Sequence, residues 1–98
     1  MRTTICQAIR ERSRIRFRYD GGGYRTAEPH CHGTSTAGNE VLRAFQTGGD
    51  SRSGEPVGWK MFDVSKLSSL SLAGETFSGP RPGYNPDDRN MGSIHCRL

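Results

Sequence analysis

The sequence predicts a small, mainly β domain that curls into a barrel and begins with one short helix. Apolar and polar residues alternate with a period of two in several short runs, which is typical of strands with one buried face. Thirteen glycines and five prolines among 98 residues indicate many turns between these runs. A chain of this length fits one domain, and a sheet of five or six short strands can protect its edges by curling on itself.

Residues 3–12 predict the helix. Ile5, Ala8 and Ile9 fall on one helical face, and either of the two threonines before that face can cap its first turn. Beyond Glu11 the hydrophobic period changes from helical to strand-like, so we expect the helix to end there.

A hairpin follows the helix. Over residues 15–19 the apolar side chains alternate with arginines, which predicts a strand, and the glycines of residues 20–23 predict a tight turn. Residues 25–31 are expected to pair back as the second strand. Pro29 places this strand at a sheet edge or near its own end, because proline cannot donate to a strand ladder.

Three further strands are expected in the second half of the domain. Residues 41–46 form the third strand, and the Gly- and Ser-rich residues 47–58 form a loop. Residues 59–64 form the fourth strand, and a short fifth strand lies around residues 69–73. These strands complete the sheet of the predicted barrel.

The C-terminal part of the chain has a different character. Residues 78–89 contain three prolines and predict an irregular Pro/Gly-rich arm on the domain surface. Residues 94–98 can return as a final strand. We therefore divide the chain into a barrel domain over residues 1–77 and a C-terminal arm over residues 78–98.

Charge favours an anionic partner. The formal net charge is +4, and six arginines lie within the first 18 residues. Arg14, Arg16 and Arg18 are separated by single apolar residues, so they lie on one face of the strand. There they can follow a phosphate backbone or keep an outward face soluble.

The three cysteines, Cys6, Cys31 and Cys96, are an odd and sparse set that does not resemble a disulfide framework. The N-terminus lacks the apolar run of a signal peptide, and no stretch is long and apolar enough to span a membrane. The sequence therefore predicts a cytoplasmic protein without membrane contact.

Metal and enzyme chemistry are weakly indicated. A zinc site would need His30, Cys31 and His32 with His95 and Cys96, but neighbouring strand residues point to opposite faces and no Cys-x-x-Cys pair is present. No nucleophile elbow or phosphate-binding glycine loop is found. We expect no metal, no cofactor and no catalytic activity.

Several segments resemble the WYL domain family when taken in order. These are AIRE at residues 8–11, IRFRY at 15–19, RTAEPH at 25–30, VLRAF at 41–45 and WKMFDVSKLSSL at 59–70. The resemblance covers residues 3–77 and implies an SH3-like or Sm-like small β-barrel. WYL domains are associated with bacterial transcription regulators, and the resemblance implies a non-catalytic module that senses nucleic acid or a nucleotide-type ligand.

The chain departs from the family pattern at three places. Glu40 and Val41 stand where the family has Trp-Tyr, Lys60 replaces an arginine, and Asp63 reverses a positive charge. We expect a standalone domain without the helix-turn-helix that accompanies many WYL domains.

The resemblance implies a basic, aromatic-lined face that binds single-stranded nucleic acid or a nucleotide. Arginine and lysine neutralise phosphates, aromatic rings stack on bases, and a tail containing Tyr84 can fold over one end of the face. The rival hypothesis is a protein-interaction or homo-oligomerisation module with a regulatory protein partner. The candidate ligand-binding residues are Arg25, Lys60, Arg43, Tyr19, Trp59 and His30.

Overall fold

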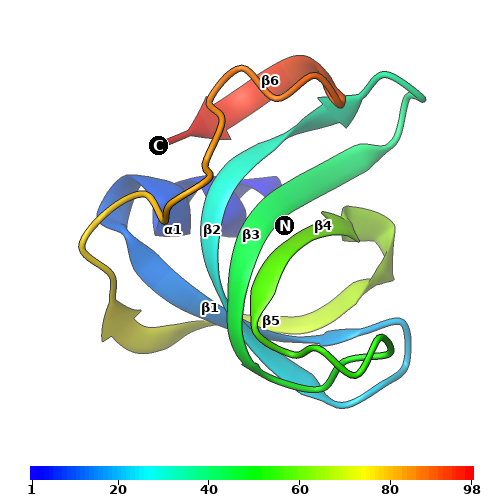
Figure 1. The fold of residues 1–98 in the computed structure, drawn as a ribbon, viewed down its shortest axis with the longest axis vertical. Helices are drawn as coiled ribbons and strands as arrows, with labels where there is room; N and C mark the ends of the chain where they lie inside the picture. The colour runs from blue at the N-terminus through cyan, green and yellow to red at the C-terminus, as the bar shows by residue number, and fades with distance from the viewer.

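The computed structural model describes all 98 residues and confirms a mainly β fold with one short N-terminal helix (Figure 1). The elements, in chain order, are α1 (Arg2–Glu11), β1 (Ser13–Tyr19), β2 (Tyr24–Ser35), β3 (Glu40–Gly49), β4 (Gly58–Asp63), the 3₁₀ turn η1 (Val64–Lys66), β5 (Leu67–Thr76) and β6 (Met91–Arg97). All strand pairs are antiparallel.

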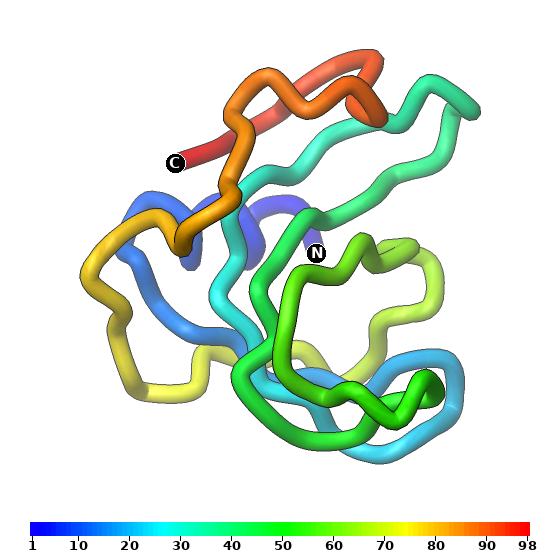
Figure 2. The backbone as a smooth tube through the Cα atoms, viewed as in Figure 1, coloured from blue at the N-terminus to red at the C-terminus, as the bar shows by residue number.

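The six strands form one sheet in the order β4-β3-β2-β1-β5, and β6 pairs separately with β2. The first half of β2 pairs with β1 and its second half pairs with β6, while β3 runs along nearly its whole length. Register shifts between neighbouring strands mark bulges, which bend a sheet. β2 and β3 curve across the molecule (Figures 1 and 2). In the chain, η1 joins β4 to β5.

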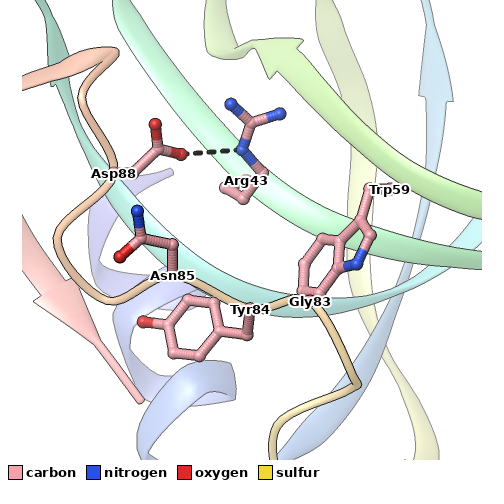
Figure 3. A pocket seen from close by; sticks show the side chains of 6 residues that line it. All are labelled: Arg43, Trp59, Gly83, Tyr84, Asn85 and Asp88. Carbon is pink, nitrogen blue, oxygen red and sulfur yellow. Dashed lines mark hydrogen bonds and ion pairs between the residues drawn. The ribbon is translucent and has the colours of Figure 1, made fainter.

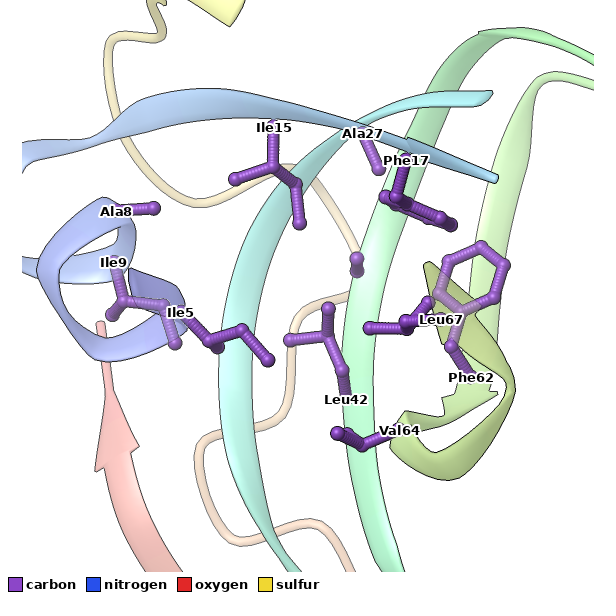
Figure 4. Close-up of a cluster of buried hydrophobic side chains, with 11 residues drawn as sticks. Ile5, Ala8, Ile9, Ile15, Phe17, Ala27, Leu42, Phe62, Val64 and Leu67 are labelled. Carbon is purple, nitrogen blue, oxygen red and sulfur yellow. The ribbon is translucent and has the colours of Figure 1, made fainter. Parts of the chain in front are cut away.

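The core lies inside the curved sheet and beneath α1 (Figure 4). The apolar face of α1 packs on one side of it, and the rings of Phe17 and Phe62 meet edge to face at 5.0 Å. Burial of these side chains provides the main stabilisation of a chain this small. The principal cluster contains Ile5, Ala8, Ile9, Ile15, Phe17, Ala27, Leu42, Ala44, Phe62, Val64 and Leu67.

The second strand is longer and more central than its sequence suggests. It extends to Ser35 instead of ending near Cys31, and it has neighbours on both sides. Pro29 is accommodated because the register against β3 shifts between Pro29 and Cys31. Bulges are among the few places where a strand tolerates a residue without an N–H.

The cysteine pattern was misleading about disulfides. Cys6 of α1 and Cys96 of β6 form a disulfide across 90 residues of sequence, with a Cα–Cα distance of 5.7 Å. Cys31 stays free and buried. Disulfides persist in oxidising compartments. The disulfide therefore removes the support that the odd number of cysteines gave to a reducing cytoplasm.

No helix in the structure has the length and apolar character needed to cross a membrane.

A candidate ligand site beneath the segment that joins β5 and β6

Residues 77–90 join β5 to β6 and contain no helix or strand, and we call them the connecting segment. Figures 1 and 2 show this segment passing from the end of β5 towards β6, outside β2. Its first residue, Phe77, is buried and donates its N–H to the carbonyl of Arg12 at 2.9 Å. The segment is therefore attached from its start to the residue that caps the end of α1.

Glu28 of β2 provides the strongest attachment for the connecting segment. Its carboxylate is fully buried and accepts hydrogen bonds from Arg81 Nε at 2.6 Å, Arg81 Nη2 at 3.0 Å and Arg14 Nε at 3.0 Å. Burial alone would raise the pKa of Glu28, but the hydrogen bonds and positive charges of the two arginines outweigh it and lower the pKa. Glu28 therefore stays ionised at neutral pH.

His30 lies next to this attachment and is also fully buried. Its Nδ1 is 2.8 Å from the carbonyl oxygen of Glu28, and its Nε2 is 3.1 Å from the backbone N–H of Arg81. A carbonyl only accepts and an N–H only donates, so the ring must carry its proton on Nδ1 and be neutral. Burial lowers the pKa of His30, which agrees with this assignment.

Trp59 of β4 forms the aromatic part of the site. Its indole Nε1 donates to the carbonyl of Pro82 at 3.0 Å, and its ring is stacked on Tyr84 with 6.2 Å between centroids and 21° between planes. The edge of His30 meets the same indole at 4.7 Å between centroids. Burial raises the pKa of Tyr84 to about 12, so its hydroxyl remains protonated.

Arg43 of β3 places a positive charge beside these rings. Its Nε donates to Asp88 Oδ2 at 2.8 Å, while its two terminal nitrogens have no protein partner. Arg43, Trp59, Gly83, Tyr84, Asn85 and Asp88 line an open hollow of about 210 Å³ (Figure 3). The hollow is therefore lined both by aromatic rings and by an arginine whose terminal nitrogens are unpaired.

The structure brings three of the six candidate residues together. His30 and Trp59 are in contact, and Arg43 lines the same hollow as Trp59. Arg25 is instead buried on the inner face of the sheet, with its guanidinium 5.1 Å from the ring centroid of Tyr19. The predicted single face is thus divided.

Tyr19 and Lys60 have other local roles. The Tyr19 hydroxyl accepts the backbone N–H of Asp63 at 2.9 Å, which ties β1 to the end of β4. Lys60 Nζ donates to the carbonyl of Glu55 at 2.7 Å and so closes the loop before β4. Neither side chain lines the hollow.

Sequence reasoning missed the contribution of Asn85 and Asp88. Asn85 immediately precedes Pro86, and Asp88 lies two residues after that proline. No periodic pattern indicates which strand such a proline-rich segment covers. Tyr84 was expected to fold over one end of the ligand face, and the structure places its ring on Trp59.

The structure gives no support for a metal site. Cys96 is bound to Cys6, and no group of three or more metal-ligating side chains comes together anywhere in the chain. Comparison with protein-family models, with curated proteins and with solved structures finds no match.

Proposed function

We propose that this protein is a non-catalytic sensing module that binds a nucleotide-type ligand in the hollow beside Trp59. The observation that carries the proposal is that Trp59 and Arg43 line the same hollow, while the two terminal nitrogens of Arg43 have no protein partner. An aromatic face stacks on a base, and a guanidinium binds phosphate through paired N–H groups. The hollow, at about 210 Å³, suits one base better than a longer ligand.

The proposal includes an SH3-like or Sm-like barrel of the WYL type. Two features support it: β1 lies between β2 and β5 in the sheet, and a single 3₁₀ turn joins β4 to β5. This arrangement curls the sheet so that its two edge strands are consecutive in the chain. Bringing the two edges of a sheet towards each other is how small β-barrels protect them.

Asp88 is the group with which a phosphate would compete for Arg43. Its carboxylate accepts a hydrogen bond from Arg43 Nε, as a phosphate oxygen would. The two terminal nitrogens of Arg43 remain free to donate to further oxygens. A phosphate would therefore compete with Asp88 or bind beside it. The Asn85 side chain, on the same wall, offers both an N–H donor and an oxygen acceptor to a base.

Intrinsic fluorescence tests the proposal directly, because Trp59 is the only tryptophan. Titration with adenosine and guanosine mononucleotides should quench Trp59 with a saturable curve. Arg43→Gln should weaken binding about tenfold or more, since it removes a charge-assisted contact of about 1.5–3 kcal/mol. Arg89→Gln is the matched control, because Arg89 is exposed and unpaired in the same connecting segment. No saturable quenching, or equal affinities for both variants, would contradict the proposal.

The rival function, a protein-interaction or oligomerisation module, stays a prediction. Light scattering across a concentration series distinguishes the two functions. A concentration-dependent dimer that does not bind nucleotides favours the rival.

A further inference from the structure

The outer face of β1 carries an exposed cluster of cations around one aromatic ring. Arg16 and Arg18 point outwards, since their strand neighbours Ile15 and Phe17 are buried in the core. Tyr24 of β2 lies opposite Arg18 in the register and is 41% exposed. The guanidinium of Arg16 lies 3.8 Å from the Tyr24 ring centroid, and that of Arg18 lies 5.8 Å away.

These two arginines have no acidic partner. Arg14, earlier on the same face, is neutralised by Glu28 and Glu75. Arg16 makes no side-chain hydrogen bond or ion pair, whereas Arg18 donates only to the carbonyl of Gly22 at 3.1 Å. The two cations are therefore uncompensated and grouped around one tyrosine ring.

The neighbouring strand positions are also free of carboxylates. Ser71 and Ser68 of β5 lie opposite Arg16 and Arg18, and Thr26 of β2 lies opposite Arg16 on the other side. Asp20, in the turn that follows β1, is paired with Arg52 at 2.8 Å. Hydroxyl groups therefore surround the cations, and hydroxyls donate to phosphate and sugar oxygens.

This combination fits single-stranded nucleic acid. Guanidinium groups bind the phosphates, and an unstacked base can lie on the tyrosine ring or on the flat guanidinium above it. A duplex keeps its bases stacked on each other and would leave Tyr24 unused. An acidic peptide would use the charges but not the aromatic surface.

We propose that the β1 surface, defined as Arg16, Arg18 and Tyr24 with Ser68 and Ser71, binds single-stranded nucleic acid. Its phosphates contact the two arginines, and one base stacks on the Tyr24–Arg16 pair. This surface shares no residue with the hollow beside Trp59, so it adds a second binding site to the proposed function.

The test is fluorescence anisotropy of a labelled 12-nucleotide single strand of mixed sequence, as DNA and as RNA, from 50 to 200 mM salt. The Arg16→Gln/Arg18→Gln double variant should bind at least tenfold more weakly at 50 mM salt. Its slope of log K against log salt should be smaller by about 1.4, at about 0.7 for each lost phosphate contact. Tyr24→Leu should weaken binding about fivefold or more at nearly unchanged slope.

The Arg10→Gln/Arg89→Gln double variant is the matched control. It removes the same charge from two exposed, unpaired arginines on α1 and the connecting segment, and it should keep nearly the parent affinity and slope. All substituted side chains are exposed, and thermal midpoints within a few degrees of the parent verify the fold.

Three results would overturn the proposal: no binding at 50 mM salt, equal losses in both double variants, or stronger binding of a polyglutamate peptide than of the single strand. The two proposed sites are tested separately. Arg43→Gln should leave oligonucleotide binding intact, and Arg16→Gln/Arg18→Gln should leave the mononucleotide quenching of Trp59 intact.

Discussion

At the residue scale, Arg25 shows how strand register can turn a predicted ligand-binding residue inward. It lies opposite Phe17, whose side chain fills the core, so Arg25 lies on the inner face of the sheet. Its guanidinium contacts the rings of Tyr19 and Phe62 and donates to Gln46 at 3.3 Å, but Nε has no partner. A buried charge without a carboxylate is costly.

We therefore expect Arg25→Met to be as stable as the parent or more so, because methionine fills similar space without a charge. Arg25→Ala should lower the free energy of unfolding by about 2–3 kcal/mol, since it leaves a cavity. Urea denaturation measures both. A methionine variant clearly less stable than the parent would show that the charge itself supports the core.

His30 makes the attachment of the connecting segment sensitive to acid. Protonation would place a second N–H on Nε2, facing the N–H of Arg81. Burial lowers the pKa of His30 below its ordinary value of 6.5, and burial also lowers that of His32. The folded protein therefore binds fewer protons than the unfolded chain in this range, and stability falls as the pH drops below about 6.5.

The thermal midpoint should thus be nearly level from pH 8 to 7 and decline from pH 6.5 to 5.5. His30→Gln should reduce the decline without abolishing it, because His32 still titrates. A second decline, below pH 4.5, should follow protonation of Glu28, whose pKa is lowered in the fold. A flat profile between pH 7 and 5.5 would contradict the neutral, buried state of both histidines.

At the element scale, β6 depends on two attachments. It pairs with the second half of β2, and the disulfide ties Cys96 to Cys6 of α1. A cross-link over this length constrains the unfolded chain strongly and is expected to contribute about 4 kcal/mol.

Cys6→Ala/Cys96→Ala should therefore lose about that much stability, whereas Cys31→Ala retains the disulfide and should lose less. Thiol titration provides the direct measurement. The native, unreduced protein should show almost no reactive thiol, because burial shields Cys31 and raises its pKa. One thiol should appear on unfolding and three after reduction. Three thiols without reduction would rule out the disulfide.

The pairing of β2 with β6 also requires a glycine at position 33. A Cβ atom at Gly33 would lie 2.1 Å from the carbonyl oxygen of Ser93 and 3.1 Å from the Cα of Ile94, both of them backbone atoms. Gly33→Ala should therefore separate the two strands and lower the thermal midpoint. Gly48→Ala is the matched control, because its Cβ would meet nothing within 4 Å. Equal midpoints for the two variants would contradict the close approach of β6.

At the scale of the whole molecule, residues 78–98, which the sequence assigns to a separate arm, make many contacts with residues 1–77. The connecting segment binds Glu28, His30, Trp59 and Arg43, and Leu98 donates its N–H to the carbonyl of His30 at 2.9 Å. Met91 is buried in a second, smaller cluster.

A chain ending at Phe77 should consequently unfold at a lower temperature than the full chain and with lower cooperativity. Removing residues 78–98 leaves the Glu28 carboxylate without Arg81 and exposes the aromatic side chains around His30. It also removes β6 and the disulfide partner of Cys6. Differential scanning calorimetry of both chains measures this. Equal midpoints would show that residues 1–77 form a self-sufficient domain.

The strands and turns were largely predictable from local pattern. The period of two over residues 15–19 predicts that Arg16 and Arg18 lie on the face of the strand opposite to Ile15 and Phe17, and the structure confirms this alternation. The hairpin turn, the third and fourth strands and the final strand also follow from local composition. Chain stereochemistry acts between near neighbours, so the sequence alone contains this information.

The candidate site was predictable only in part. Trp59 and Arg43 were identified from the sequence, but their partners Tyr84 and Asp88 come from a segment without periodicity. The pairing of Cys6 with Cys96 and the inward face of Arg25 depend on contacts between residues far apart in the chain.

By itself, the sequence determined the mainly β class, the order of the elements and the positive strand face of β1. The tertiary structure alone decided which faces and segments meet. It turned Arg25 inward, placed the connecting segment over Trp59 and His30, and linked the helix to the last strand. The physical reason is that alternation sets the relative orientation of neighbours within one strand, whereas register, bulges and packing set which strand face meets the core.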